Sequence, residues 1–143
     1  MKKLLFLDFD GVLHPNFSQG RELFARVDLL MEALGTHTAE LEVIISSSWR
    51  FQYPLDELLD FLPEALRQLV SGATPEIEPG RHQRYREIQA FLDWHKGRPP
   101  WRALDDDASG FPKACPELIF CDGRVGIDSG TVMHLRSWLK IPS

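Results

Sequence analysis

The sequence has few cysteines, no long apolar run and no excess of positive charge. Its two cysteines, Cys115 and Cys121, are six positions apart, a spacing that fits neither a CxxC zinc knuckle nor a disulfide framework. We therefore expect reduced thiols in a cytoplasmic protein. A net charge of -5 argues against a surface that attracts nucleic acid as a whole, although it says little about any single face.

Membrane-spanning helices need roughly 18 consecutive apolar residues, and no run in this chain approaches that length. The segment Leu4-Leu5-Phe6-Leu7 follows Met-Lys-Lys in the manner of a signal peptide, but Asp8 and Asp10 interrupt it at once. It is better explained as a buried strand, and we expect no membrane association. A length of 143 residues with 43% hydrophobic residues fits one domain over residues 1–143.

Short apolar runs alternate with segments of helical periodicity. The apolar runs predict strands over residues 3–9, 41–45, 101–104 and 118–121. Helical spacing predicts helices over residues 23–34, after Pro54, from Pro63 to Val70, over 85–95 and from about Thr131 to Lys140. Gly35 should end the first helix, and Asp128 or Ser129 should cap the last. Residues 72–80 should form a loop, either wholly irregular or with one short extended piece. This order predicts an α/β sandwich with a mostly parallel sheet.

Polar residues lie at or directly after the carboxyl end of each predicted strand. They are Asp8 and Asp10, Ser46, Asp105 and Asp106, and Asp122. The carboxyl ends of parallel strands meet at one edge of the sheet, where α/β folds bind ligands. Carboxylates gathered there repel one another unless a cation lies between them, and Mg²⁺ suits such oxygen ligands. Gly11 permits a sharp turn or a close backbone approach directly after the first pair.

Four motifs resemble those of the haloacid dehalogenase-like (HAD) superfamily, in the order that the family has them. They are Asp8-Phe9-Asp10-Gly11-Val12-Leu13, Val43-Ile44-Ile45-Ser46, a basic residue near a helix start, and Leu104-Asp105-Asp106. Arg84 is the first choice for the basic residue, with Arg86 and Arg81 as alternatives. More narrowly, DFDGVLHP with ISSSWR and ALDDD resembles small HAD domains associated with bacterial RNA-repair proteins.

The resemblance implies a three-layer Rossmann-like sandwich with only a minimal cap. It also implies that Asp8 is the nucleophile and that Asp10 is the general acid and base. Ser46, Ser47, Gly11 and Arg84 are implied to bind the phosphoryl group. Mg²⁺ is implied as cofactor, held by Asp8, by the backbone carbonyl of Asp10, and by Asp106 or Asp105, of which Asp106 is preferred.

By this resemblance the chain is a Mg²⁺-dependent phosphomonoester hydrolase that forms an aspartyl phosphate. The segments between its motifs are too short for a full cap domain, so an open site is expected to admit bulky substrates such as nucleic-acid ends. The basic cluster Arg81, His82, Arg84 and Arg86 would guide such a substrate or form a solvated helix face.

Two other functions use the same residues. One is a catalytically silent module that binds a phosphate or a partner, which the intact pair Asp8 and Asp10 argues against. The other is phosphoryl transfer to an acceptor other than water. His14 is expected to be structural. The tryptophans are expected to pack in the core or at its rim, with Trp49 as the exception to watch because it directly follows the serines. The sequence does not indicate an oligomeric state.

Overall fold

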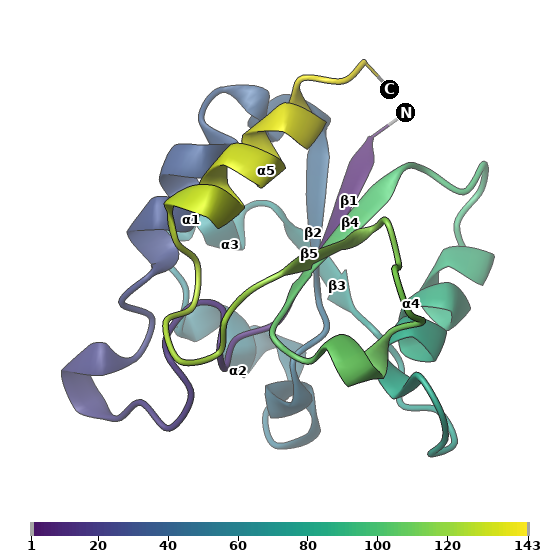
Figure 1. The fold of residues 1–143 in the computed structure, drawn as a ribbon, viewed down its shortest axis with the longest axis horizontal. Helices are drawn as coiled ribbons and strands as arrows, with labels where there is room; N and C mark the ends of the chain where they lie inside the picture. The colour runs from purple at the N-terminus through teal and green to yellow at the C-terminus, as the bar shows by residue number, and fades with distance from the viewer. Residues whose placement is uncertain (1, 143) are drawn as a thin grey trace.

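The computed structural model describes residues 2–142 and shows a five-stranded sheet between two layers of helices (Figure 1). The strands are β1 (Lys3–Leu7), β2 (Leu41–Ile45), β3 (Val70–Ala73), β4 (Trp101–Asp105) and β5 (Leu118–Phe120). Their order is β3-β2-β1-β4-β5, and every neighbouring pair is parallel. The helices are α1 (Val27–Leu34), α2 (Leu55–Asp60), α3 (Glu64–Arg67), α4 (Gln83–Asp93) and α5 (Ser129–Leu139). The predicted α/β sandwich is confirmed.

The central strand β1 is buried on both faces because its side chains alternate between two cores. Leu5 and Leu7 belong to the larger core, to which α1, α2, α3 and α5 contribute. Leu4 and Phe6 belong to the smaller core, in which Ile88 and other α4 residues pack. In Figure 1, α1 and α5 lie together on one side of the sheet and α4 lies on the other. The continuous apolar run of β1 follows from this double cover.

The first helix begins later than its periodicity predicts. Helix α1 starts at Val27 rather than at residue 23, because Phe24 has a φ of 60° and the N–H of Arg26 donates to the Leu13 carbonyl oxygen. The backbone before Val27 is therefore bound to the loop after β1 instead of to a helical turn. Gly35, with a φ of 51°, ends the helix as predicted.

The segment from Pro63 to Gly80 contains a strand that begins where a helix was predicted and reaches into the predicted loop. Helix α3 ends at Arg67 instead of reaching Val70, and residues 70–73 form β3 at the edge of the sheet. The N–H of Val43 donates to the Leu69 carbonyl oxygen, and Val43 pairs with Val70. This pairing with β2 outweighs the local helical spacing, as tertiary contacts often do.

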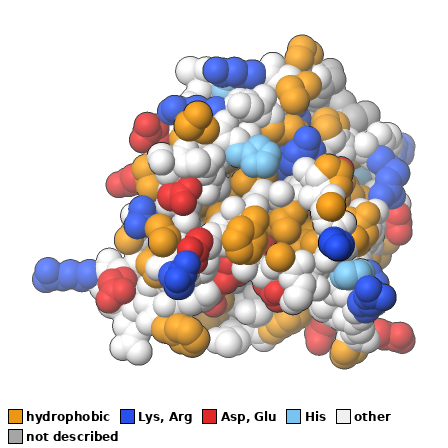
Figure 2. Space-filling view, in the orientation of Figure 1, with side chains coloured by type: hydrophobic (Ala, Val, Ile, Leu, Met, Phe, Trp, Pro, Cys, Tyr) orange, Lys and Arg blue, Asp and Glu red, His pale blue; other side chains and the backbone are white. Residues whose placement is uncertain are grey.

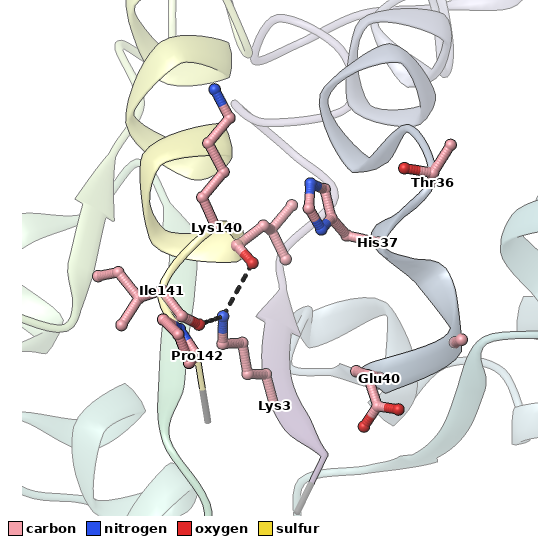
Figure 3. Close-up of a pocket in the computed structure, with 9 residues that line it drawn as sticks. Lys3, Thr36, His37, Glu40, Lys140, Ile141 and Pro142 are labelled. Atoms are coloured by element: carbon pink, nitrogen blue, oxygen red, sulfur yellow. Dashed lines mark hydrogen bonds between the residues drawn. The ribbon is translucent and has the colours of Figure 1, made fainter.

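At the amino end of the sheet, Lys3 ties β1 to the end of α5 (Figure 3). Its buried ammonium group donates to the carbonyl oxygens of Trp138 at 2.9 Å and of Leu139 at 3.0 Å, and also to that of Ile141. These contacts bind carbonyl groups at the end of the helix, of which that of Trp138 also accepts from the Ile141 N–H at 3.1 Å. The adjoining pocket, which His37 also lines, therefore lies at the opposite edge from the strand-end acids.

Basic and acidic side chains are interspersed on the face drawn in Figure 2, in keeping with the modest net charge. Within residues 2–142, no helix combines the length and the apolar character needed to cross a membrane. Cys115 and Cys121 form no disulfide, as predicted. Burial raises the pKa of Cys121 to about 12, so this thiol packs in the core rather than reacting.

Candidate active site

Three carboxylates meet where the strand order changes direction, between β1 and β4. Asp8 follows β1, Asp105 ends β4, and Asp106 comes next. One oxygen atom of each lies within 4.8 Å of the others. Ligands of open α/β sheets bind at such a switch point. A donor set of three carboxylates fits a hard divalent cation such as Mg²⁺, so these residues can hold the predicted metal.

The carboxylate forms of the two most buried acids, Asp8 and Asp105, are unfavourable unless a positive charge lies close by. Burial raises the pKa of Asp8 well above its ordinary value, and the charge of Asp105 raises it further, while Arg84 opposes the shift. Burial likewise raises the pKa of Asp105 to about 6, against the opposing effects of Arg84 and the Asp107 N–H group. A bound cation would relieve this repulsion.

Of the three candidate arginines, the structure brings Arg84 to the acids. Its Nε atom lies 3.2 Å from Oδ2 of Asp105. Arg86 instead donates to the carbonyl oxygens of Arg81 at 2.8 Å and of Glu78 at 2.9 Å, so it holds together the loop before α4. The predicted basic cluster therefore splits, and only Arg84 serves the acidic site.

Two buried donors beside the acids have no hydrogen-bond partner among residues 2–142. One is the Oγ atom of Ser46, a residue only 1% exposed at the end of β2, and the other is Nη1 of Arg84. Burying a polar group without a partner is costly, so such atoms call for an explanation. Hydroxyl and guanidinium groups are suitable donors to the oxygens of an anionic ligand. Ser47 also lies at this strand end, where its Oγ atom accepts from the Trp49 N–H at 3.2 Å.

Asp106 lies tightly against the backbone of two glycines. Gly11 has a φ of 77°, and a Cβ atom there would overlap the Asp106 carboxylate. A Cβ atom at Gly123 would overlap the same carboxylate and the side chain of Asn16. Asn16 itself donates to Oδ2 of Asp106 at 2.8 Å. Gly11 thus meets both predicted needs, the sharp turn and the close approach.

A buried arginine braces the loop that presents the serines. Arg50 donates through Nη1 to the carbonyl oxygens of Ser46 at 2.9 Å and Ser47 at 3.0 Å, and through Nε to that of Thr74 at 2.9 Å. Its Nη2 atom lies 2.7 Å from Oε2 of Glu87, and both side chains are only 5% exposed. This ion pair ties the ends of β2 and β3 to α4.

Asp10 lies two residues after Asp8, outside the cluster of three acids. Its Oδ1 atom is 2.8 Å from Nε2 of His14, and its Oδ2 atom accepts from the Trp49 indole N–H at 2.9 Å. The expected packing role of Trp49 is therefore incomplete, since its indole also binds a candidate catalytic acid. The position of Trp49 directly after the serines is what set it apart in the sequence, and His14, four residues after Asp10, contacts a candidate catalytic acid although a structural role was expected.

Asp122, the acid after β5, is not part of the cluster. Its side chain bonds to Arg124, with Oδ2 2.8 Å from Nη2, and this contact lowers the pKa of Asp122 to about 2. The carboxylate closes its own turn, since it also accepts from the backbone N–H of Arg124 at 3.0 Å. Asp122 was therefore wrongly grouped with the strand-end acids of the site. Asn16, by contrast, was not predicted at all, because its contact with Asp106 spans 90 positions and has no local signature.

Comparison with known proteins agrees with this arrangement. Residues 4–132 match the family described as the HAD domain in Swiss Army Knife RNA repair proteins. The matched range includes all four motifs and the cluster of acids. No curated protein and no solved structure matches the chain at a significant level. Because the family match covers most of the sequence, the chain belongs to the HAD domains of Swiss Army Knife RNA repair proteins.

Proposed function

We propose that the protein is a Mg²⁺-dependent phosphomonoester hydrolase that works through an aspartyl phosphate on Asp8. One observation carries this proposal: the acids Asp8, Asp105 and Asp106 converge with Arg84 and the unpartnered hydroxyl of Ser46 at one edge of the sheet. Anionic ligands for a cation and donors for a phosphoryl group lie together there. A module that only bound a partner would not need this combination.

In the proposed reaction, a carboxylate oxygen of Asp8 attacks phosphorus as the bond to the leaving oxygen breaks. Asp10 gives its proton to that oxygen, so the alcohol departs neutral. Asp10 then takes a proton from a water molecule that attacks the phosphorus of the aspartyl phosphate. Inorganic phosphate leaves and Asp8 is restored. Ser46 and Arg84 donate to the phosphoryl oxygens throughout and stabilise the charge that gathers on them.

Mg²⁺ would be held by Asp8 and Asp106, with the backbone carbonyl of Asp10 and Asp105 as further candidates. When bound, it would supply positive charge that offsets both the carboxylates and the phosphoryl oxygens. We assign Asp106 rather than Asp105 to the metal because Asp105 already faces Arg84, whereas Asp106 is oriented by the neutral amide of Asn16.

We further propose phosphorylated nucleic-acid ends as the substrates. From the first motif up to the start of α4, the segments between the motifs contain only short elements, the longest being the eight residues of α1, so they form no more than a minimal cap. Large aromatic side chains are exposed on the segments that follow β1 and β2, namely Phe17 at 99%, Phe51 at 53% and Phe61 at 37%. Aromatic rings of this kind stack on unpaired bases. The family description, which names RNA repair, favours the same substrate class.

Hydrolysis of 4-nitrophenyl phosphate tests the proposed activity. We expect turnover with Mg²⁺ and none after chelation by EDTA, with recovery when Mg²⁺ is returned, because the buried acids need the cation. Asp106→Asn should require a much higher Mg²⁺ concentration for half-maximal rate. A wild-type protein that folds but hydrolyses no member of a broad panel of phosphate esters would favour the binding module instead.

Oligonucleotides that carry a 5′- or a 3′-phosphate test the substrate class. We expect their phosphate to be released with a higher kcat/KM than that of small phosphorylated metabolites. A preference for metabolites would contradict the nucleic-acid assignment, and a preference for phosphopeptides would point to a protein substrate. Transfer of the phosphoryl group to an added alcohol rather than to water would show a phosphotransferase.

A further inference from the structure

The Asp10 carboxylate is held on both sides although much of it faces solvent. Its side chain is 47% exposed, yet each of its two oxygens has an N–H partner. A carboxylate at such a position usually rotates and exchanges its partners with water. The two contacts here come from separate parts of the chain, one from the loop after β1 and the other from the short helical turn Ser48–Phe51 after β2.

The first partner, His14, is placed by a tight turn. The N–H of Gly11 donates to the His14 carbonyl oxygen at 2.8 Å, and that of Leu13 donates to the Phe9 carbonyl oxygen at 2.9 Å. This turn folds the fully buried imidazole back onto the carboxylate four residues earlier. The Asp10 contact to Nε2 of the ring is 2.8 Å long.

A second hydrogen bond fixes which nitrogen of His14 carries the hydrogen. The backbone N–H of Phe24 points at Nδ1, 3.1 Å away. A backbone N–H can only donate, so Nδ1 is the acceptor and Nε2 of the neutral ring carries the hydrogen. His14 therefore donates to Asp10. Because its Nδ1 atom accepts from a backbone N–H, the ring cannot pass a proton on to a second group.

The second partner, Trp49, can act only as a donor. Its indole N–H lies 2.9 Å from Oδ2 of Asp10. Aromatic contacts hold the indole ring in place, with centroid distances of 5.5 Å to Phe9, 5.5 Å to Phe24 and 5.2 Å to Phe61. The rings of His14 and Trp49 also contact each other, with centroids 5.9 Å apart, and both pack against Phe24. Two donors held in one aromatic cluster thus set the direction of one partly exposed carboxylate.

We propose that His14 and Trp49 are positioning residues that make Asp10 an effective general acid toward poor leaving groups, an inference that rests on the proposed phosphatase activity. As the leaving oxygen departs, the O–H bond of Asp10 breaks and a new O–H bond forms on the leaving group. Negative charge stays on Asp10, where the two N–H groups stabilise it. Neither residue touches the substrate or carries the proton itself.

This role predicts a loss of rate that depends on the leaving group. 4-Nitrophenyl phosphate releases an anion that needs little protonation, whereas benzyl phosphate, of similar shape, releases a far more basic alkoxide. Trp49→Phe keeps the aromatic packing but removes the donor. We expect kcat/KM to fall about 10-fold or more with benzyl phosphate, as for the loss of a hydrogen bond to a charged group, and to change little with 4-nitrophenyl phosphate.

Variants at position 14 provide an independent check. His14→Leu should give the same pattern as Trp49→Phe, whereas His14→Gln, whose amide can donate from about the Nε2 position, should recover part of the benzyl phosphate activity. Tyr53→Phe is the matched control, because its ring contacts Trp49 at 6.0 Å within the same aromatic cluster. It should leave both substrates unaffected.

Equal losses of kcat/KM on the two substrates would show a merely structural role and overturn the inference. Unchanged kcat/KM on both substrates would overturn it as well. In both cases Asp8-dependent hydrolysis of 4-nitrophenyl phosphate would still support the proposed function. An inactive wild-type protein would contradict both the proposed function and the positioning role of His14 and Trp49. The indole N–H resonance of Trp49 gives a readout that needs no turnover. It should move upfield in Asp10→Asn, and an unchanged resonance would contradict the hydrogen bond.

Discussion

Replacing Asp8 with Asn is expected to lower kcat for 4-nitrophenyl phosphate by about 1,000-fold or more, because the amide cannot form the covalent intermediate. The same substitution should stabilise the fold in the absence of metal. Burial and the charge of Asp105 raise the pKa of Asp8, which means that its carboxylate form is unfavourable in the folded protein. Asn keeps the shape and removes the charge. Initial rates and thermal unfolding of the same protein sample measure both effects.

The sign of the stability effect follows from linkage. A carboxyl group whose pKa is raised by folding stabilises the protein fully below its unfolded pKa of about 3.9, and this contribution is lost as the pH rises through the folded value. For Asp105 that folded value is about 6. Metal-free wild-type protein should therefore lose stability as the pH rises from about 4 to about 6, and Asp8→Asn should lose less.

Asp107→Asn is the matched control for Asp8→Asn. Asp107 is exposed, and its Oδ1 atom accepts from the Ser109 N–H at 3.0 Å, a bond that an amide oxygen can keep. It should change neither the rate nor the melting temperature appreciably. An active, fully metal-dependent Asp8→Asn enzyme would refute the assignment of the nucleophile, and a lowered melting temperature in metal-free buffer would contradict the electrostatic account of the site.

Replacing Glu87 with Ala is expected to lower the free energy of unfolding by about 3–5 kcal/mol. Arg50 would then lie buried without its counter-charge, and burial already lowers the pKa of that guanidinium group against the opposing effect of Glu87. Urea unfolding followed by circular dichroism measures the loss. Because Arg50 also holds the Ser46 and Ser47 carbonyl oxygens, activity should fall as well.

An exposed ion pair provides the comparison for Glu87→Ala. Asp93 and Arg98 lie 2.7 Å apart, but their side chains are 65% and 52% exposed. Asp93→Ala should cost less than about 1 kcal/mol. Should Glu87→Ala fail to fold, Glu87→Gln, which keeps a hydrogen-bond acceptor for Arg50, provides a milder step in the same direction. Equal, small losses for the buried and the exposed pair would contradict the bracing role of Arg50.

Strand-end residues were the most predictable part of the site, because parallel strands bring their carboxyl ends together whatever the loops do. Asp8, Ser46, Asp105 and Asp106 could be placed at one edge from the apolar runs that precede them. Arg84 had two competing candidates, since three arginines lie near the start of α4. Only the folded chain shows that Arg86 turns back to the carbonyl oxygens of Glu78 and Arg81.

Contacts between distant loops were the least predictable part. The Asn16 bond to Asp106 and the Glu87 pair with Arg50 join segments that no local pattern relates. The late start of α1 has the same cause, because Phe24 takes a positive φ and its N–H serves His14 instead of a helical turn. Local periodicity records what a segment prefers alone, and these residues respond to partners elsewhere in the fold.

The central claim, a covalent phosphate on Asp8, can be measured directly by mass spectrometry. Asp10→Asn should still be phosphorylated by 4-nitrophenyl phosphate, whose leaving group needs little protonation, but should hydrolyse the intermediate slowly. Acid-quenched protein is then expected to carry one phosphoryl group, labile to hydroxylamine, on the peptide that contains Asp8. Phosphate on Ser46 or on any other residue, or steady release of 4-nitrophenol with Asp8 unmodified, would contradict the account.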